Sequence, residues 1–198
     1  TIWNINIFPY LTGLGIAGIA VGFAVKDTLS NIIGGIALIF DGNIRIGDKI
    51  KLQSGYVGVI EDIGLRTTKM KTYDNEMIIV PNGILSNDII HNYALPNPLN
   101  RVYVDFGVAY GTDPEKVEKV ITKTLATIKD AIKDDPVPAI DFLEMADSSL
   151  NFRAKFWVEN YTKAYSAKIE AVKKIYKALN KANIAIPFPQ MDVHMKKK

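Results

Sequence analysis

Residues 13–31 read GLGIAGIAVGFAVKDTLSN, and this stretch decides how the rest of the chain can fold. Only Lys26 and Asp27 interrupt an uncharged run that extends from the first residue to Phe40, whereas charges recur every few residues from Asp41 onward. A bilayer core about 30 Å thick is spanned by about 20 apolar helical residues. The sequence therefore predicts a membrane-spanning helix followed by a water-exposed region, and we expect further membrane spans upstream of Thr1.

The apolar residues of this helix divide into four stripes at about 100° per residue. One stripe contains only glycine, a second contains only alanine, and two bulky apolar stripes separate them. The stripes are Gly15, Gly18 and Gly22; Ala17, Ala20 and Ala24; Ile16, Ile19 and Phe23; and Leu14, Val21 and Val25.

Small residues mark close helix contacts in lipid, because van der Waals packing drives association there. Two opposed small-residue stripes predict that each helix has two identical neighbours, as in a closed ring. One bulky stripe then faces the ring axis. We assign Ile16, Ile19 and Phe23 to it, since apolar constrictions can gate a pore by dewetting.

Two other interpretations of this segment remain open. A buried helix of a soluble protein would also explain regularly spaced glycines, which cost up to about 1 kcal/mol each in a helix. The span 13–18 also matches G-x-G-x-x-G, a dinucleotide-binding fingerprint, with Asp41 downstream. Against the fingerprint, Pro9 interrupts the strand that should precede it.

The charged pair Lys26 and Asp27 predicts a break in the helix. Asp27 or Thr28 would cap a second, amphipathic helix that runs from Thr28 to about Phe40, with Gly34-Gly35 as its weak point. Charges are costly inside lipid, so this pair should lie at the cytoplasmic mouth.

The sequence of the water-exposed region predicts two domains that differ in secondary structure. Short strands at 46–52, 56–63, 65–72 and 77–80, ending at a turn at 81–83, are typical of a small β-barrel. A strand at 102–109, a helix that opens at Asp113-Pro114, strands at 139–145 and 150–158, and a helix at 164–183 follow the ferredoxin-like order. The last helix should bury Ile169, Val172, Ile175, Tyr176 and Leu179, and a last short strand is expected at 191–195.

Residues that support catalysis or cofactor binding are sparse. The absence of cysteine excludes disulfides, cysteine-based zinc sites and iron–sulfur clusters. His91 and His194 have no ligand-spaced partners, and no nucleotide-binding or hydrolase motif follows Asp41. The net charge of +3 does not favour nucleic acid, and the basic residues do not cluster with exposed aromatics as in an RNA-binding barrel. We expect no enzyme activity, no cofactor, no metal and no nucleic-acid partner.

Five motifs together resemble the small-conductance mechanosensitive channels (MscS-like). They are the Gly/Ala-rich helix 15–28 with the L-S-N signature at 29–31, RIGD at 45–48, the Thr67-Thr68 strand, IVPNG at 79–83 and FPQMDV at 188–193. These motifs occur in the family's order from about residue 11 to the C-terminus.

The resemblance implies a multi-domain membrane protein. Residues 1–41 would form an α-helical, pore-lining segment with a kinked cytoplasmic extension. Residues 42–98 would form a small Sm-like β-barrel domain, 99–186 a ferredoxin-like α+β domain, and 187–198 a C-terminal strand in an oligomeric β-barrel. The domains would be cytoplasmic, in a multi-pass protein of the plasma or inner membrane.

The resemblance also implies residue roles and partners. Ile19 and Phe23 match the family's constricting rings, and Gly35 matches a second hinge. Asp27 stands where some members carry a kink glycine, and we assign it to the kink together with Lys26. Asn31 is assigned to the coupling between domains. The chain would form a homo-oligomer, a heptamer, in contact with membrane lipids. When membrane tension opens this channel during hypo-osmotic shock, it would release ions and small solutes. The alternatives are a non-conducting, membrane-anchored Sm-like/ferredoxin-like scaffold and a nucleotide-binding enzyme.

Overall fold

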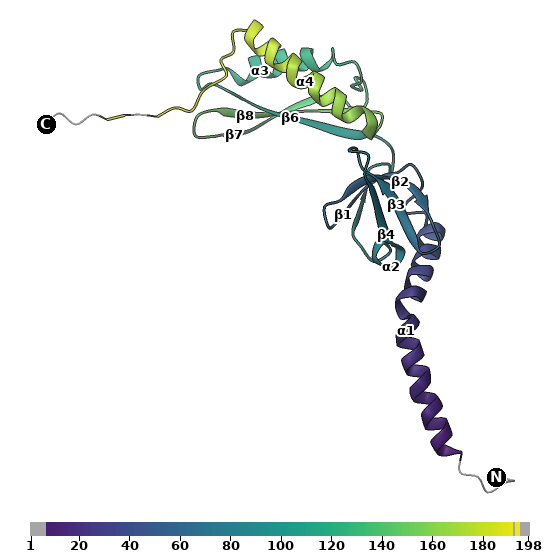
Figure 1. Ribbon diagram of the computed structural model, residues 1–198. Coiled ribbons are helices and arrows are strands. Elements are labelled where there is room, and N and C mark those ends of the chain that lie inside the picture. Colours follow the sequence, from purple (N-terminus) through teal and green to yellow (C-terminus); the bar gives the residue numbers. More distant parts are fainter. Residues whose placement is uncertain (1–6, 192, 195–198) are drawn as a thin grey trace. The chain divides into compact units, whose positions relative to one another are not determined.

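The computed structural model describes residues 7–191, 193 and 194 in two compact units, 1–93 and 94–198 (Figure 1). The first unit begins with one long helix, α1 (Phe8–Asp41), which has Pro9 in its first turn and ends at Gly42 with a left-handed φ of 64°. Proline has no amide hydrogen to lose in a first turn, and glycine adopts a positive φ without strain.

The predicted break at Lys26–Thr28 is wrong, because α1 is continuous through this segment. Aspartate and threonine cost under about 0.7 kcal/mol each inside a helix, which is too little to end it. The side-chain amide of Asn31 also donates a hydrogen bond of 2.8 Å to the carbonyl oxygen of Asp27 and reinforces this turn.

The β-domain of the first unit is a five-stranded antiparallel sheet in the order β4-β3-β2-β1-β5. The elements are β1 (Lys49–Leu52), β2 (Val57–Ile63), β3 (Thr67–Lys71), β4 (Met77–Pro81), α2 (Asn82–Leu85) and β5 (Ile90–Asn92). Four strands were predicted, whereas α2 and β5 were not. The predicted turn at 81–83 is the point where β4 passes into α2. Leu38 of α1 joins the buried cluster of this domain.

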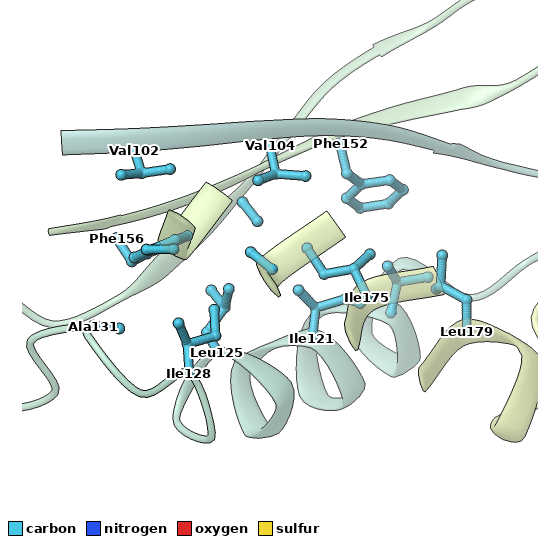
Figure 2. Close-up of a cluster of buried hydrophobic side chains, with 14 of the residues drawn as sticks. Val102, Val104, Ile121, Leu125, Ile128, Ala131, Phe152, Phe156, Ile175 and Leu179 are labelled. Atoms are coloured by element: carbon cyan, nitrogen blue, oxygen red, sulfur yellow. The ribbon is translucent and has the colours of Figure 1, made fainter. Parts of the chain in front are cut away.

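The second unit is a three-stranded antiparallel sheet, β6-β8-β7, with two helices on one face. Its elements are β6 (Asn100–Val108), α3 (Pro114–Leu125), β7 (Ala139–Met145), β8 (Leu150–Val158) and α4 (Tyr161–Lys181). The predicted β-α-β-β-α order is confirmed. Figure 2 shows the core, in which Phe152, Phe156 and Val104 of the strands face Ile121 and Ile175 of the helices.

Local caps explain where the two helices of this unit begin. The Asp113 carboxylate accepts a hydrogen bond of 3.0 Å from the Glu115 amide, and the Asn160 side chain accepts one of 3.0 Å from the Thr162 amide. Such caps satisfy amides that have no partner within the helix. The predicted cap at Asp113 is confirmed.

The predicted buried face of α4 is only partly right. Ile175 and Leu179 are buried, but Ile169, Val172 and Tyr176 are exposed, and alanines at 167 and 171 take the inner positions. The small alanine side chains let α4 come close to the sheet, and the phenylalanine side chains of the sheet fill the space between helix and sheet.

The segment after α4 has no helix or strand over residues 184–191. Ala109 donates a backbone hydrogen bond of 2.9 Å to Ala185, and the Gln190 amide donates one of 3.1 Å to the Ser148 hydroxyl. Of the strand predicted at 191–195, Met191, Val193 and His194 lie in no strand, while residues 192 and 195 lie outside the described residues.

Candidate functional site

The N-terminal part of α1 is exposed on every side. All side chains from Ile7 to Ser30 are exposed, including Ile16, Ile19 and Phe23 at 66, 63 and 73%. By length and composition α1 is able to cross a membrane, and the rest of the chain covers none of its most apolar window. The helix presents an apolar surface that only lipid or another protein surface can cover.

All residues of the four predicted stripes lie within α1, so each stripe occupies one side of a regular helix. A β-carbon added at Gly13, Gly15, Gly18 or Gly22 would meet no atom within 4 Å. These glycines are therefore not required by any contact among the described residues. They leave shallow flanks beside the row formed by Ile16, Ile19 and Phe23.

The dinucleotide fingerprint is excluded by this geometry. Gly13, Gly15 and Gly18 lie inside α1, where helical hydrogen bonds engage the backbone amides. A phosphate cradle needs a strand, a turn and then the first turn of a helix. No such strand precedes these glycines in the described residues.

The opposite end of α1 packs closely on the β-domain through two glycines. A β-carbon on Gly34 would lie 2.7 Å from the Asn82 carbonyl oxygen, and one on Gly35 would lie 2.5 Å from the Leu65 carbonyl oxygen. Real β-carbons do not approach that closely, so both positions require glycine. Gly35, which the resemblance assigns to a hinge, is a contact residue in this structure.

Asn31 connects α1 to the β-domain. Its side-chain oxygen accepts a hydrogen bond of 2.9 Å from the Gly83 amide, 52 residues later, while its side-chain nitrogen donates to Asp27. A β-carbon on Gly83 would lie 3.0 Å from the same oxygen. One side chain therefore ties the turn that contains Asp27 to α2.

Asn82 organises the β-domain side of this junction. It is fully buried, accepts a hydrogen bond of 2.8 Å from the Thr68 hydroxyl and donates one of 2.8 Å to the Gly64 carbonyl. A buried amide whose oxygen and nitrogen both have hydrogen-bond partners favours one arrangement of the elements around it. The sequence indicated Asn82 only as a turn residue, although the Pro81-Asn82-Gly83 motif was a usable signal.

A groove of about 620 Å³ lies between α1 and the segment after α2. Lys26 lies at this groove, beside apolar residues of α1, and Ser86 and Asn87 line its other side. Lys26 and Asp27 are exposed, so the structure does not bury either predicted kink residue.

Charged and aromatic side chains alternate on the sheet face of the second unit that the helices leave open. Arg153 forms a two-pronged ion pair with Asp105 at 2.6 and 2.8 Å, and its hydrogen bond lowers the pKa of that carboxyl. The Arg101 guanidinium lies 5.0 Å from the Tyr103 ring and 5.2 Å from the Trp157 ring. The face is internally paired rather than arranged around a reacting group.

Groups of side chains that could hold a metal ion are absent from the part of the chain that the structure describes. No group of three or more histidine, aspartate or glutamate side chains is placed to hold a metal ion there. His91 and His194 belong to different units and are both exposed.

Comparison with known proteins matches both units. The β-domain of mechanosensitive ion channels matches residues 27–95, and the C-terminal domain of the mechanosensitive ion channel MscS matches residues 102–186. The crystal structure of Helicobacter pylori MscS in a closed state is 31% identical, with a TM-score of 0.89 over 98% of this chain and 76% of that one. The Arabidopsis thaliana MSL1 structure, at 20% identity and a TM-score of 0.72, shares the fold.

Curated relatives are longer than this chain. An MscS family protein of Aquifex aeolicus is 32% identical over 98% of this chain and 54% of its own length. The large-conductance channel MscMJLR of Methanocaldococcus jannaschii is 34% identical over 97% and 54%. The small-conductance mechanosensitive channel of Edwardsiella ictaluri is 38% identical over 90% and 61%. The chain thus spans between half and two-thirds of the relatives' length.

Proposed function

The chain belongs to the MscS family of mechanosensitive ion channels, and from that premise we propose that it forms the pore and cytoplasmic domains of a homo-oligomeric channel opened by membrane tension. One observation carries the proposal. The exposed row of Ile16, Ile19 and Phe23 on α1 lies between a glycine flank and an alanine flank, both of which are exposed and not covered by any residue that the structure describes.

Identical helices can pack side by side when the glycine flank of one receives the alanine flank of the next. Gly18 and Ala20 illustrate the two flanks. In lipid, small residues let backbones approach, and each approach adds dispersion contacts. A ring in which every helix has two such neighbours directs the Ile/Phe row to its axis and the Leu/Val row to lipid.

The ring of apolar side chains at the axis is the proposed gate. A narrow apolar constriction excludes water and therefore ions, although no atom blocks the path. Tension favours the state with the larger area in the membrane plane. Tilting of the helices along their small-residue seams withdraws Ile19 and Phe23 from the axis, and the pore wets.

The junction of α1 with the β-domain supports transmission of this motion. Asn31 and the close contacts of Gly34 and Gly35 attach the helix to α2, so the end of α1 cannot tilt freely. Bending in the open or closed assembly is therefore expected near Lys26 and Asp27, between the free and the attached parts. Gly35 acts there as a fixed contact.

The β-domain supports a ring independently of α1. Its sheet ends at β4 on one side and β5 on the other, so the described strands leave two different edges. Two different edges on one copy suit a head-to-tail ring. We propose seven copies, the number that the family resemblance implies, in a cell membrane with both units in the cytoplasm.

Release of ions and small solutes in hypo-osmotic shock is the proposed physiological role. The family is one of ion channels rather than enzymes. A non-conducting scaffold anchored by α1 is the second candidate, and single-channel recording separates the two. Only a channel gives stepwise currents that depend on applied tension after reconstitution into lipid.

The decisive experiment replaces Phe23 with serine in the complete natural polypeptide. The variant Phe23→Ser adds a polar group to the gate row, so the closed pore should wet more easily and the tension threshold should fall. Patch-clamp recording with stepped pressure measures this threshold. The matched control is Val21→Ser, which places the same hydroxyl on the row that faces lipid.

Val21→Ser should leave the threshold near its original value. An unchanged threshold in Phe23→Ser, or an equal change in both variants, would contradict the assignment of the gate row. Absence of tension-dependent current in the unmodified protein would contradict the channel itself.

A further inference from the structure

Helix α4 carries two apolar rows, and only one of them belongs to the core. Ala167, Ala171, Ile175 and Leu179 are buried. The second row, here named the α4 row, consists of Tyr165, Ile169, Val172 and Tyr176, exposed at 76, 39, 45 and 60%. The spacing of 4, 3 and 4 residues places these side chains on one face of the helix.

The α4 row lies on the flank of α4 that faces away from α3. On the α3 flank, the Lys174 ammonium donates a hydrogen bond of 2.7 Å to the carbonyl of Thr127, which follows α3. On the other flank, the charge of Lys168 acts on Asp105 of β6 and helps to lower its pKa. The row is therefore on the side of β6, which is one edge of the sheet.

A second exposed apolar surface lies at the opposite edge, on β7. The β7 patch consists of Phe142, Leu143 and Met145, exposed at 42, 46 and 73%. Phe142 stacks on the buried Phe152 ring at a centroid distance of 4.9 Å. Phe152 faces α3 and α4, so Phe142 lies on the helix side of the sheet although the helices leave it exposed.

The charges that border the two surfaces are opposite in sign. Lys168 and Lys173 border the α4 row, whereas two acidic residues lie at the β7 patch. Glu144 is on β7, where its carboxylate accepts a hydrogen bond of 2.9 Å from the Asn151 side chain, and Asp147 follows the strand. All four side chains are exposed, and none forms a salt bridge within the described residues. Opposite charges around apolar centres are the pattern of complementary protein surfaces.

One copy cannot bring these two surfaces together. Strand β8 lies between β6 and β7, so the edges are two strand spacings apart, about 10 Å, and they face in opposite directions. A second copy can present its β7 patch to the α4 row. Because the two surfaces differ, each contact leaves one of each free for the next copy, which is the condition for a ring.

We propose that the α4 row of one copy docks on the β7 patch of a second copy of this chain. This inference rests on the proposed homo-oligomer and adds the surface by which the second units join. Tyr165 and Tyr176 supply the aromatic area that dominates such contacts, and Lys173 approaches Glu144. The helix layer of one unit then covers the strand that the helices of the next unit leave exposed.

Cysteine cross-linking tests the contact, because the chain has no cysteine of its own. The full chain with Val172→Cys and Met145→Cys is treated in detergent with a short bifunctional maleimide. We expect a ladder of covalent multimers on a denaturing gel. Each single variant should remain monomeric on that gel, since a cysteine on only one surface has no partner.

The matched control pair is Val172→Cys with Thr122→Cys, which moves the second cysteine to the exposed face of α3. It should form several-fold fewer multimers. Lys173→Glu in the Val172→Cys/Met145→Cys background should slow cross-linking several-fold, and Glu144→Lys added to it should restore the rate. All of these positions are exposed, so the core is undisturbed.

Native mass measurement of the same sample distinguishes a failure of this docking surface from a failure of the homo-oligomer. A multimeric mass with no more cross-linking than in the control pair would overturn this docking surface and leave the channel proposal intact. A monomeric mass would overturn the homo-oligomer itself. A multimeric mass with the full ladder is the expected result.

Discussion

At the scale of single residues, the two glycines at 34 and 35 decide how close α1 comes to the β-domain. Both are buried, and an added β-carbon would lie within about 3 Å of backbone atoms of Asn82 or Leu65. Glycines 15, 18 and 22 have the same chemistry but open space around them. Glycine therefore has two roles in α1. At 34 and 35 it allows close packing on the β-domain, and at 15, 18 and 22 it leaves an open flank on the helix surface.

Gly35→Ala should destabilise the first unit, because the new methyl group overlaps the Leu65 carbonyl. Overpacking of this kind costs about 1–3 kcal/mol. A loss of 1 kcal/mol lowers the unfolding midpoint of a domain this size by about 4–8 °C. Thermal unfolding in detergent measures this shift of the midpoint. Gly13→Ala is the control, and an equal midpoint in both variants would contradict the close contact.

The ion pair of Asp105 and Arg153 predicts a pH effect. The hydrogen bond from Arg153 lowers the folded-state pKa of Asp105 below 3.8. A lowered pKa means that the contribution to stability is complete above about pH 3.8 and is lost as the pH falls through the folded value. Asp105→Asn should therefore lower the unfolding midpoint at neutral pH, and the difference should shrink in acid.

Asp147→Asn is the control for this pH series, because it removes an exposed carboxyl that forms no salt bridge in the described residues. The size of the Asp105 effect should be small, since the pair is largely exposed to solvent. A difference that grows toward acid would contradict the role assigned to the pair.

At the scale of elements, one hydrogen bond links α1 to α2. Asn31→Leu removes the acceptor of the Gly83 amide, and a net loss of about 1 kcal/mol makes local opening about fivefold more frequent. Hydrogen exchange read by mass spectrometry on a peptide that contains Gly83 should be faster by that factor. Asn31→Asp keeps the acceptor oxygen for Gly83 and loses only the donor to Asp27, so the Gly83 peptide should exchange more slowly than in Asn31→Leu.

Equal exchange in both variants would mean that Asn31 does not hold the junction. The same pair of variants applies to gating. If the link transmits helix motion, Asn31→Leu should alter the response to sustained tension more than Asn31→Asp does.

At the scale of the whole molecule, one part of the chain has a surface suited to lipid and the rest has a surface suited to water. From Phe8 to Ser30, α1 exposes its apolar side chains all round, whereas the β-domain and the second unit each have a buried apolar cluster of their own. Assembly is therefore expected to depend on the α1 flanks, where helix packing in lipid requires small residues.

Gly18→Leu should hinder the ring, because its side chain separates neighbouring helices at the glycine flank. The expected result is a shift from multimer to smaller species in native mass measurements. Val21→Leu, on the row that faces lipid, should leave the multimer intact. A full multimer with Gly18→Leu would show that the glycine flank is not a contact.

Local patterns made much of this structure predictable. The stripes of α1, the strands at 139–145 and 150–158 and the cap at Asp113 all depend on residues within a few positions of one another. Periodicity and capping preferences act over that range, so they are readable in a single sequence. The Gly/Ala-rich helix and the motifs after it likewise carried the family resemblance.

Only the tertiary structure decided which surfaces meet. It placed Asn31 on Gly83 across 52 residues and made Gly35 a contact where a hinge was expected. It also chose the alanine row of α4 for the core and left the tyrosine row outside. Each choice depends on shape and hydrogen bonding between residues far apart in the chain, and local sequence patterns carry no record of which distant residue will be the partner.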